Sequence, residues 1–127
     1  METERLLVYR PMYELLSLID DMVVLFPKRM QRTIGDRMLT QAIDAMVALN
    51  EAHHSPDDVS RVRCQQIILS KVNAIRILVR LCNEKQILSV KQIEKLVRLT
   101  DSVGKQINAW KHKTEQQRGV SLNNARY

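Results

Sequence analysis

The stretch LFPKRMQRTIGDRM, residues 25–38, ends one helical pattern and begins another. Apolar residues recur at spacings of three and four from Met12 to Phe26. Pro27 ends this series, because a residue that precedes proline is pushed out of the helical region. A second series begins at Met30, and the break between the two carries four basic residues, Lys28, Arg29, Arg32 and Arg37. The stretch therefore predicts two helices joined by a short basic elbow.

Two helices flank this elbow and a third follows them. The first covers residues 11–26 and has a proline in its first turn, and the pattern leaves open whether the apolar residues 6–9 extend it. The second covers residues 30–52. The third covers residues 55–83 and begins with the start signal SPDD, in which Ser55 is the expected N-cap.

The fourth predicted helix begins with SVKQ, a capping box in which Ser89 and Gln92 cap each other's backbone. It ends near His112. Residues 114–127 lack apolar periodicity, which predicts a disordered tail. Four helices with short loops are typical of an antiparallel up-and-down arrangement, so we expect an all-α four-helix bundle over residues 1–113.

The composition favours one helical domain over a β-rich, disordered or membrane-spanning chain. Of 127 residues 45% are apolar and only 4% aromatic, with 3 Gly and 3 Pro. No window approaches the roughly 20 apolar residues of a membrane span, and the acidic N-terminus is unlike a signal peptide. Cys64 and Cys82 would lie about 27 Å apart on one helix, too far to bridge, so we expect free thiols and a cytoplasmic protein.

Patterns typical of catalytic or metal sites are absent from the sequence. It contains no nucleophile elbow, zinc-protease motif or phosphate-binding loop. His53 and His54 lie at the end of a predicted helix, where histidine is ordinary, and no Cys or carboxylate stands at ligand spacing. We therefore expect a protein that is not an enzyme and needs no cofactor or metal.

The net charge of +6 is divided unevenly between the two halves of the chain. Residues 1–58 hold six Lys/Arg and ten Asp/Glu, a net of −4, whereas residues 59–127 hold fourteen Lys/Arg and four Asp/Glu, a net of +10. Such asymmetry favours a polyanionic partner. The alternative is a solvated basic face that binds nothing.

Two of the predicted helices gather basic side chains on one face each. A helical projection of the fourth helix gathers five basic residues within about 80° of its circumference, namely Lys91, Lys95, Arg98, Lys105 and Lys113. Several Lys or Arg on one surface bind phosphates through counterion release, and no aromatic platform for reading bases stands beside them. With the elbow, the predicted nucleic-acid contacts are Lys28, Arg29, Arg32, Arg76, Arg80, Lys91, Lys95, Arg98 and Lys105.

The third helix is apolar around most of its circumference and needs burial on more than one side. This excess suggests a subunit interface, the alternative being a central helix within its own bundle. Gly104, on the apolar face of the fourth helix, suggests close approach of a neighbouring helix or subunit, the alternative being a glycine with no structural role. Trp110 is expected to close the end of the bundle, the alternative being an interface anchor.

Two segments, FPKRMQRTIGDRM (residues 26–38) and ILSVKQIEKLVRLTDSVGKQINAWKH (residues 87–112), resemble the accessory variability determinant proteins of diversity-generating retroelements. These proteins belong to a wider set of small four-helix-bundle proteins, some encoded in intervening sequences of bacterial large-subunit ribosomal RNA genes. The family features are an F-P-K step, a T-x-G-x-R start of the second helix, and a glycine followed by W-K at the end of the fourth. The matching residues here are Phe26, Pro27, Lys28, Thr33, Gly35, Arg37, Gly104, Trp110 and Lys111.

The resemblance implies a pentamer of bundles with a basic surface. It implies binding to the element's reverse transcriptase and to its template RNA, in support of error-prone complementary-DNA synthesis. The nucleic-acid contacts named above rest on charge projection alone, and the choice between RNA and DNA stays open. The alternative, from another functional class, is an oligomeric interaction protein of the ribosomal RNA intervening-sequence type with no reverse transcriptase partner.

Overall fold

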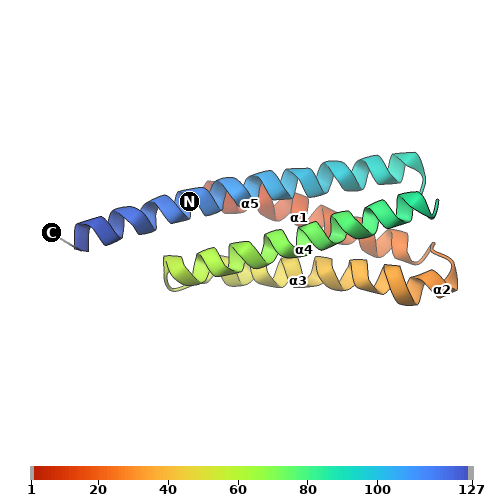
Figure 1. Ribbon diagram of the computed structural model, residues 1–127, viewed down its shortest axis with the longest axis horizontal. Coiled ribbons are helices and arrows are strands. Elements are labelled where there is room, and N and C mark those ends of the chain that lie inside the picture. The colour runs from red at the N-terminus through yellow and green to blue at the C-terminus, as the bar shows by residue number, and fades with distance from the viewer. Residues whose placement is uncertain (1, 126–127) are drawn as a thin grey trace.

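The structure, a computed structural model, describes the backbone of residues 2–125 and the side chains of residues 7–119. Its long elements are four α-helices: α1 (Glu2–Val23), α3 (Asp36–His53), α4 (Asp58–Glu84) and α5 (Val90–Ala125). They run antiparallel and are joined by short connections (Figure 1). The predicted all-α, up-and-down four-helix bundle is confirmed.

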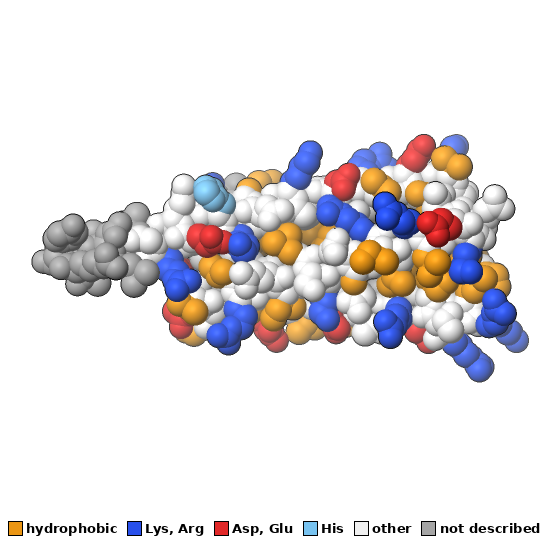
Figure 2. Space-filling view, in the orientation of Figure 1, with side chains coloured by type: hydrophobic (Ala, Val, Ile, Leu, Met, Phe, Trp, Pro, Cys, Tyr) orange, Lys and Arg blue, Asp and Glu red, His pale blue; other side chains and the backbone are white. Residues whose placement is uncertain are grey.

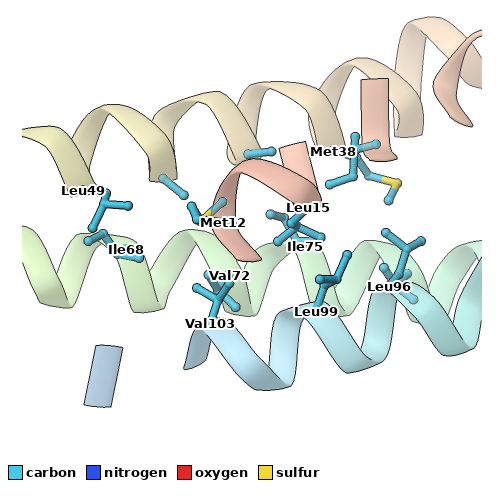
Figure 3. Close-up of a cluster of buried hydrophobic side chains, with 14 of the residues drawn as sticks. Met12, Leu15, Met38, Leu49, Ile68, Val72, Ile75, Leu96, Leu99 and Val103 are labelled. Carbon is cyan, nitrogen blue, oxygen red and sulfur yellow. The ribbon is translucent and has the colours of Figure 1, made fainter. Parts of the chain in front are cut away.

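The four helices enclose one elongated core. Both α1 and α4 pack against α3 and α5, so α1 and α4 lie diagonally across the bundle from each other. Each fully buried aliphatic side chain stabilises such a core by about 1.5–3 kcal/mol. Every long helix contributes to it, as the labelled side chains show: Met12, Leu15, Met38, Leu49, Ile68, Val72, Ile75, Leu96, Leu99 and Val103 (Figure 3).

Helix α1 begins at Glu2, so the apolar residues 6–9 do extend the first helix and Pro11 lies inside it. Proline has no N–H, and the helical hydrogen bond to the carbonyl of Leu7 is therefore missing. Val8 and Met12, on either side of this defect, are both fully buried. Their burial offsets the lost hydrogen bond.

The basic elbow is an internally bonded connection between α1 and α3. Phe26 is buried at the end of the core, and the side-chain amide of Gln31 donates to two backbone carbonyls, at 2.8 and 2.9 Å. After Pro27 the chain forms the short helix α2 (Lys28–Met30) and the π-helical segment η1 (Gln31–Gly35), which lead directly into α3. The elbow therefore has a defined shape.

The starts of α4 and α5 test two predicted caps. The prediction of Ser55 for α4 is wrong: its hydroxyl donates to a carbonyl of α3 at 2.8 Å, and the N-cap is Asp57. The Asp57 carboxylate accepts from the N–H of Ser60 at 2.7 Å, which holds the pKa of Asp57 below its usual value. The capping box of α5 is confirmed, with Ser89 Oγ accepting from the Gln92 N–H at 3.2 Å and Gln92 Oε1 accepting from the Ser89 N–H at 2.9 Å.

Helix α5 is longer than the sequence pattern predicts. The expected end near His112 is wrong, because the helix continues to Ala125 and includes most of the segment predicted to be disordered. Residues 126–127 lie outside the described residues. Figure 1 shows α5 running past the start of α4 at the end of the bundle opposite the elbow.

A buried polar pair explains why the pattern fails there. Thr114 is fully buried, donates to the carbonyl of Trp110 at 2.9 Å and accepts from Gln65 Nε2 at 3.1 Å. Gln65 is also fully buried. Inward-facing positions occupied by polar residues break the apolar periodicity on which the prediction depended. Trp110 is 3% exposed and lies inside the bundle end, as expected.

Candidate nucleic-acid interface

The elbow presents three of the predicted contact residues. Lys28, Arg29 and Arg32 are carried by α2 and η1, and all three side chains are exposed. Among the described residues none of the three forms an ion pair. Positive charge at the start of a helical segment opposes the helix dipole, so a bound anion would relieve an unfavourable arrangement.

Arg76 is tied to the neighbouring helix. Its Nη2 donates to the carbonyl of Thr100 at 3.1 Å and to Asp101 Oδ1 at 3.2 Å. The side chain remains 43% exposed, but its charge is shared with a carboxylate. Of the two predicted α4 contacts, Arg76 therefore has an evident structural role, which joins α4 to α5.

Gly104 provides the space for this arrangement. A Cβ atom on Gly104 would lie 2.9 Å from Arg76 Nη2. The close approach that the glycine suggested is therefore made by a side chain of α4 within the same bundle, and a neighbouring subunit is not needed to explain it.

Arg80 lies one helical turn beyond Arg76 and is exposed. Within the described part of the chain it makes no ion pair. Arg80 lines a cleft of about 310 Å³ between α4 and α5, together with Arg76 and six other residues. Of the α4 arginines that the sequence selected, Arg80 is the one free to meet a ligand.

The remaining predicted contacts follow the outer face of α5. Lys91, Lys95, Arg98 and Lys105 are all exposed. The two acids of this helix segment, Glu94 and Asp101, lie among them, and Asp101 is the partner of Arg76. Over residues 91–105 the face keeps a positive excess, because it carries four basic residues against two carboxylates, one of which is paired with Arg76.

The fold brings the two basic regions of the sequence to one end of the molecule. The elbow and the turn between α4 and α5 lie at the same end of the bundle (Figure 1). Figure 2 shows Lys and Arg side chains spread over the visible face and more closely spaced toward this end. The predicted contacts at or near it are Lys28, Arg29, Arg32, Arg80, Lys91 and Lys95. We call this group the basic end.

Helix α4 also exposes an apolar face, which we call the α4 face. Val59 is 48% exposed, Ile67 39% and Ile77 62%, and the half-buried Ala74 and Leu81 lie on the same side of the helix. Figure 2 shows apolar side chains in a band along the middle of the visible surface, with basic side chains on both sides. The excess of apolar residues predicted for this helix is therefore present at the surface.

One exposed aromatic pair was missed by reasoning from the sequence. The rings of Tyr9 and Tyr13 stack with centroids 6.4 Å apart and an interplanar angle of 13°, and each residue is more than half exposed. Their spacing of four on a helix was the available signal. They lie on α1, diagonally across the bundle from α4, and therefore away from the two α4 arginines.

Among the described residues, no group of three or more His, Cys, Asp or Glu could hold a metal ion. Burial raises the pKa of the Cys82 thiol to about 11, and its Sγ lies 3.8 Å from the sulfur of Met38. No described helix combines the length and the apolar character needed to cross a membrane.

No protein-family model and no curated protein sequence matches the chain. Its fold is similar to the crystal structure of a protein of unknown function from the S23 ribosomal protein family of Bacteroides thetaiotaomicron VPI-5482, with a TM-score of 0.80. The two chains are 13% identical, and the similarity covers 86% of this chain and 98% of the other. At this identity the similarity shows a shared fold. The chain is therefore similar in fold to a member of the S23 family, and its resemblance to the retroelement accessory proteins stays a prediction.

Proposed function

We propose that this protein is a non-enzymatic, cytoplasmic accessory protein that binds the reverse transcriptase and the template RNA of a diversity-generating retroelement. In that role it supports mutagenic reverse transcription without performing it. The observation that carries the nucleic-acid part is the basic end, where exposed Lys and Arg side chains from distant parts of the sequence lie together. The resemblance of residues 26–38 and 87–112 to that family supports the polymerase partner.

Binding at the basic end is electrostatic. Exposed Lys and Arg side chains bind phosphates chiefly by releasing the counterions condensed on the nucleic acid, which makes affinity fall steeply with salt. Phosphates repeat regularly along any strand, so these contacts fix position and do not read sequence. The elbow contributes from a bonded connection of defined shape, which limits the entropy lost on binding.

The α4 face supports self-association as part of the same proposal. Ile67 and Ile77 expose apolar surface on a helix whose other side already fills the core. A closed ring would cover this surface once per subunit, and the family resemblance points to five subunits. Such a ring would present several basic ends to one RNA, and multivalent contact raises the apparent affinity.

The α4 face and the Tyr9–Tyr13 stack favour a second candidate function. Exposed apolar and tyrosine side chains are typical of protein interfaces. An oligomeric interaction protein of the ribosomal RNA intervening-sequence type would use these surfaces and would leave the basic end solvated.

The deciding experiment combines a pull-down with an RNA titration. The chain is co-expressed with a reverse transcriptase encoded beside its gene, and the RNA titration is repeated at several salt concentrations. We expect co-purification of the polymerase and RNA affinity that falls linearly with salt on a double-logarithmic plot. A protein that self-associates but neither captures the polymerase nor binds RNA at low salt would favour the second candidate.

A further inference from the structure

A cleft of about 310 Å³ lies between the C-terminal half of α4 and the first turns of α5, beside the basic end. Its walls come from two helices, and one of its arginines, Arg80, makes no ion pair within the described residues. Its lining comprises Arg76, Val79, Arg80, Asn83, Ile93, Val97, Thr100 and Asp101.

The floor of the cleft is apolar. Val79 is buried, Ile93 is half-buried and Val97 is 44% exposed. Exposed apolar surface between two helices is unfavourable unless a ligand removes it from water. The floor therefore suits a ligand with an apolar face.

The walls of the cleft are polar and differ in whether their side chains are bonded within the protein. At one end the Arg76 guanidinium is held by Thr100 and Asp101, which makes it a fixed wall. At the other end Arg80 and Asn83 are exposed, and within the described residues neither makes a side-chain hydrogen bond to another residue. A planar guanidinium and a side-chain amide that both donates and accepts are thus available to a ligand.

We infer that this cleft holds one unpaired nucleobase of the RNA, an inference that rests on the proposed function. The flat face of a base would cover Ile93 and Val97, and the Asn83 amide would hydrogen-bond the base edge. Arg80 would stack on the base or meet its phosphate, as guanidinium groups do in RNA-binding proteins. The fold thereby supplies a base site although the sequence shows no aromatic platform.

The charge around the cleft favours this ligand over a peptide. Two arginines, Arg76 and Arg80, line it, and its one carboxylate, Asp101, is paired with Arg76. Phosphates flank every unpaired base at a fixed spacing. The base of one nucleotide can therefore cover the apolar floor while its phosphate contacts the basic rim. In an A-form duplex the bases are stacked inside and cannot reach such a floor, so binding should depend on unpaired nucleotides.

The test uses one RNA duplex and the same duplex with a single bulged nucleotide. We expect the wild-type protein to bind the bulged RNA about tenfold more tightly, the lower range of base-stacking effects. The variants Asn83→Ala and Val97→Gln should abolish this ratio and leave duplex affinity unchanged. Both replaced side chains are exposed, and thermal melting checks the fold of each variant. Lys105→Gln, outside the cleft, should lower the affinity for both RNAs equally and preserve the ratio of the two affinities.

Three results would overturn the inference. Equal wild-type affinity for the two RNAs would remove the base site but leave the proposed RNA binding intact. A ratio that survives both cleft variants would place the bulge contact elsewhere. Cleft variants that keep both RNA affinities but no longer capture the reverse transcriptase would assign the cleft to a protein partner. Absence of any RNA binding at low salt would instead refute the proposed function itself.

Discussion

The guanidinium of Arg76 lies over Gly104, at a position where a Cβ atom would stand 2.9 Å from Nη2. Because Gly104 has no side chain, Arg76 can cross the surface of α5 and donate to the carbonyl of Thr100. Glycine inside a helix costs about 1 kcal/mol relative to alanine. The contact of Arg76 with α5 provides the compensation.

Replacing Gly104 with Ala should therefore change stability in a manner that depends on Arg76. In the native background the gain in helix propensity should be cancelled by displacement of the Arg76 hydrogen bonds, each of which contributes about 1 kcal/mol. In an Arg76→Gln background the same change should stabilise the protein by about 1 kcal/mol. Urea unfolding of the wild type, the two single variants and the double variant, all at one protein concentration, gives the coupling energy between the two positions. Equal effects of Gly104→Ala in both backgrounds would contradict the contact between Arg76 and Gly104.

Gly35 should tolerate no side chain. A Cβ atom there would lie 2.7 Å from Val23 Cγ1 and 3.4 Å from Phe26 Cδ2, and both side chains are buried. Overpacking of this kind costs about 1–3 kcal/mol, so Gly35→Ala should lower the melting temperature. In a Val23→Ala background, Gly35→Ala should be less harmful, because the smaller side chain at position 23 opens space for the added Cβ atom. The matched control is Gly119→Ala, where no atom lies within 4 Å and a gain of up to about 1 kcal/mol is expected.

Gln86 should be improved by glycine. Within the described part of the chain it is the non-glycine residue with a positive φ, 55°, and it follows the C-cap of α4. Its N–H donates to Asn83 O at 3.1 Å and the Ile87 N–H donates to Cys82 O at 3.0 Å, the pattern of a Schellman motif. Gln86→Gly should stabilise the protein by about 1 kcal/mol, because a left-handed conformation strains any residue with a Cβ atom. Lys85→Gly, one position earlier at φ −87°, should destabilise it. A reversed order of the two variants in thermal melting would refute this assignment.

The two α4 arginines should differ in RNA binding. Arg80→Gln should weaken binding to all sequences and reduce the salt slope by about 1, since Arg80 has no ion-pair partner among the described residues. Arg76→Gln should have a smaller effect on affinity and a larger one on stability, because Arg76 already pairs with Asp101. Fluorescence anisotropy at several salt concentrations measures the first quantity and thermal melting the second. Equal effects of the two changes on the salt slope would show that Asp101 does not restrain Arg76 in solution.

The α4 face should control self-association. We expect the 14.8 kDa chain to scatter light as an oligomer, with a pentamer as the expected closed ring. Replacing Ile67 and Ile77 together with Gln should lower the mass to that of one chain. Val24, 68% exposed beside the elbow, provides a control whose replacement with Gln should leave the mass unchanged. A wild-type protein with the mass of one chain at micromolar concentration would contradict the ring.

The elements that follow simple patterns could be predicted from the sequence, and those that depend on buried polar groups could not. Proline and a capping box act on neighbouring residues, so the elbow after Phe26 and the start of α5 after its cap Ser89 could be predicted from short stretches of sequence. The ion pair between Arg76 and Asp101 joins residues on different helices, so the residue pattern of neither helix alone predicts it. Charge projection could select exposed basic residues, but it could not separate Arg76, which is engaged, from Arg80, which is not.

The buried pair of Gln65 and Thr114 has a consequence for the register of the bundle. Two long helices with repeating apolar ridges can slide past each other by one turn, about 5.4 Å, and still pack tolerably. In the observed register the hydroxyl of Thr114 accepts from Gln65 Nε2. A bundle slipped by one turn would keep the bond of Thr114 to the carbonyl of Trp110 but would leave the buried Gln65 amide without this acceptor. The contact between Gln65 and Thr114 thus fixes the register of α5 against α4. This register determines how far α5 projects past the start of α4, at the end of the bundle opposite the elbow.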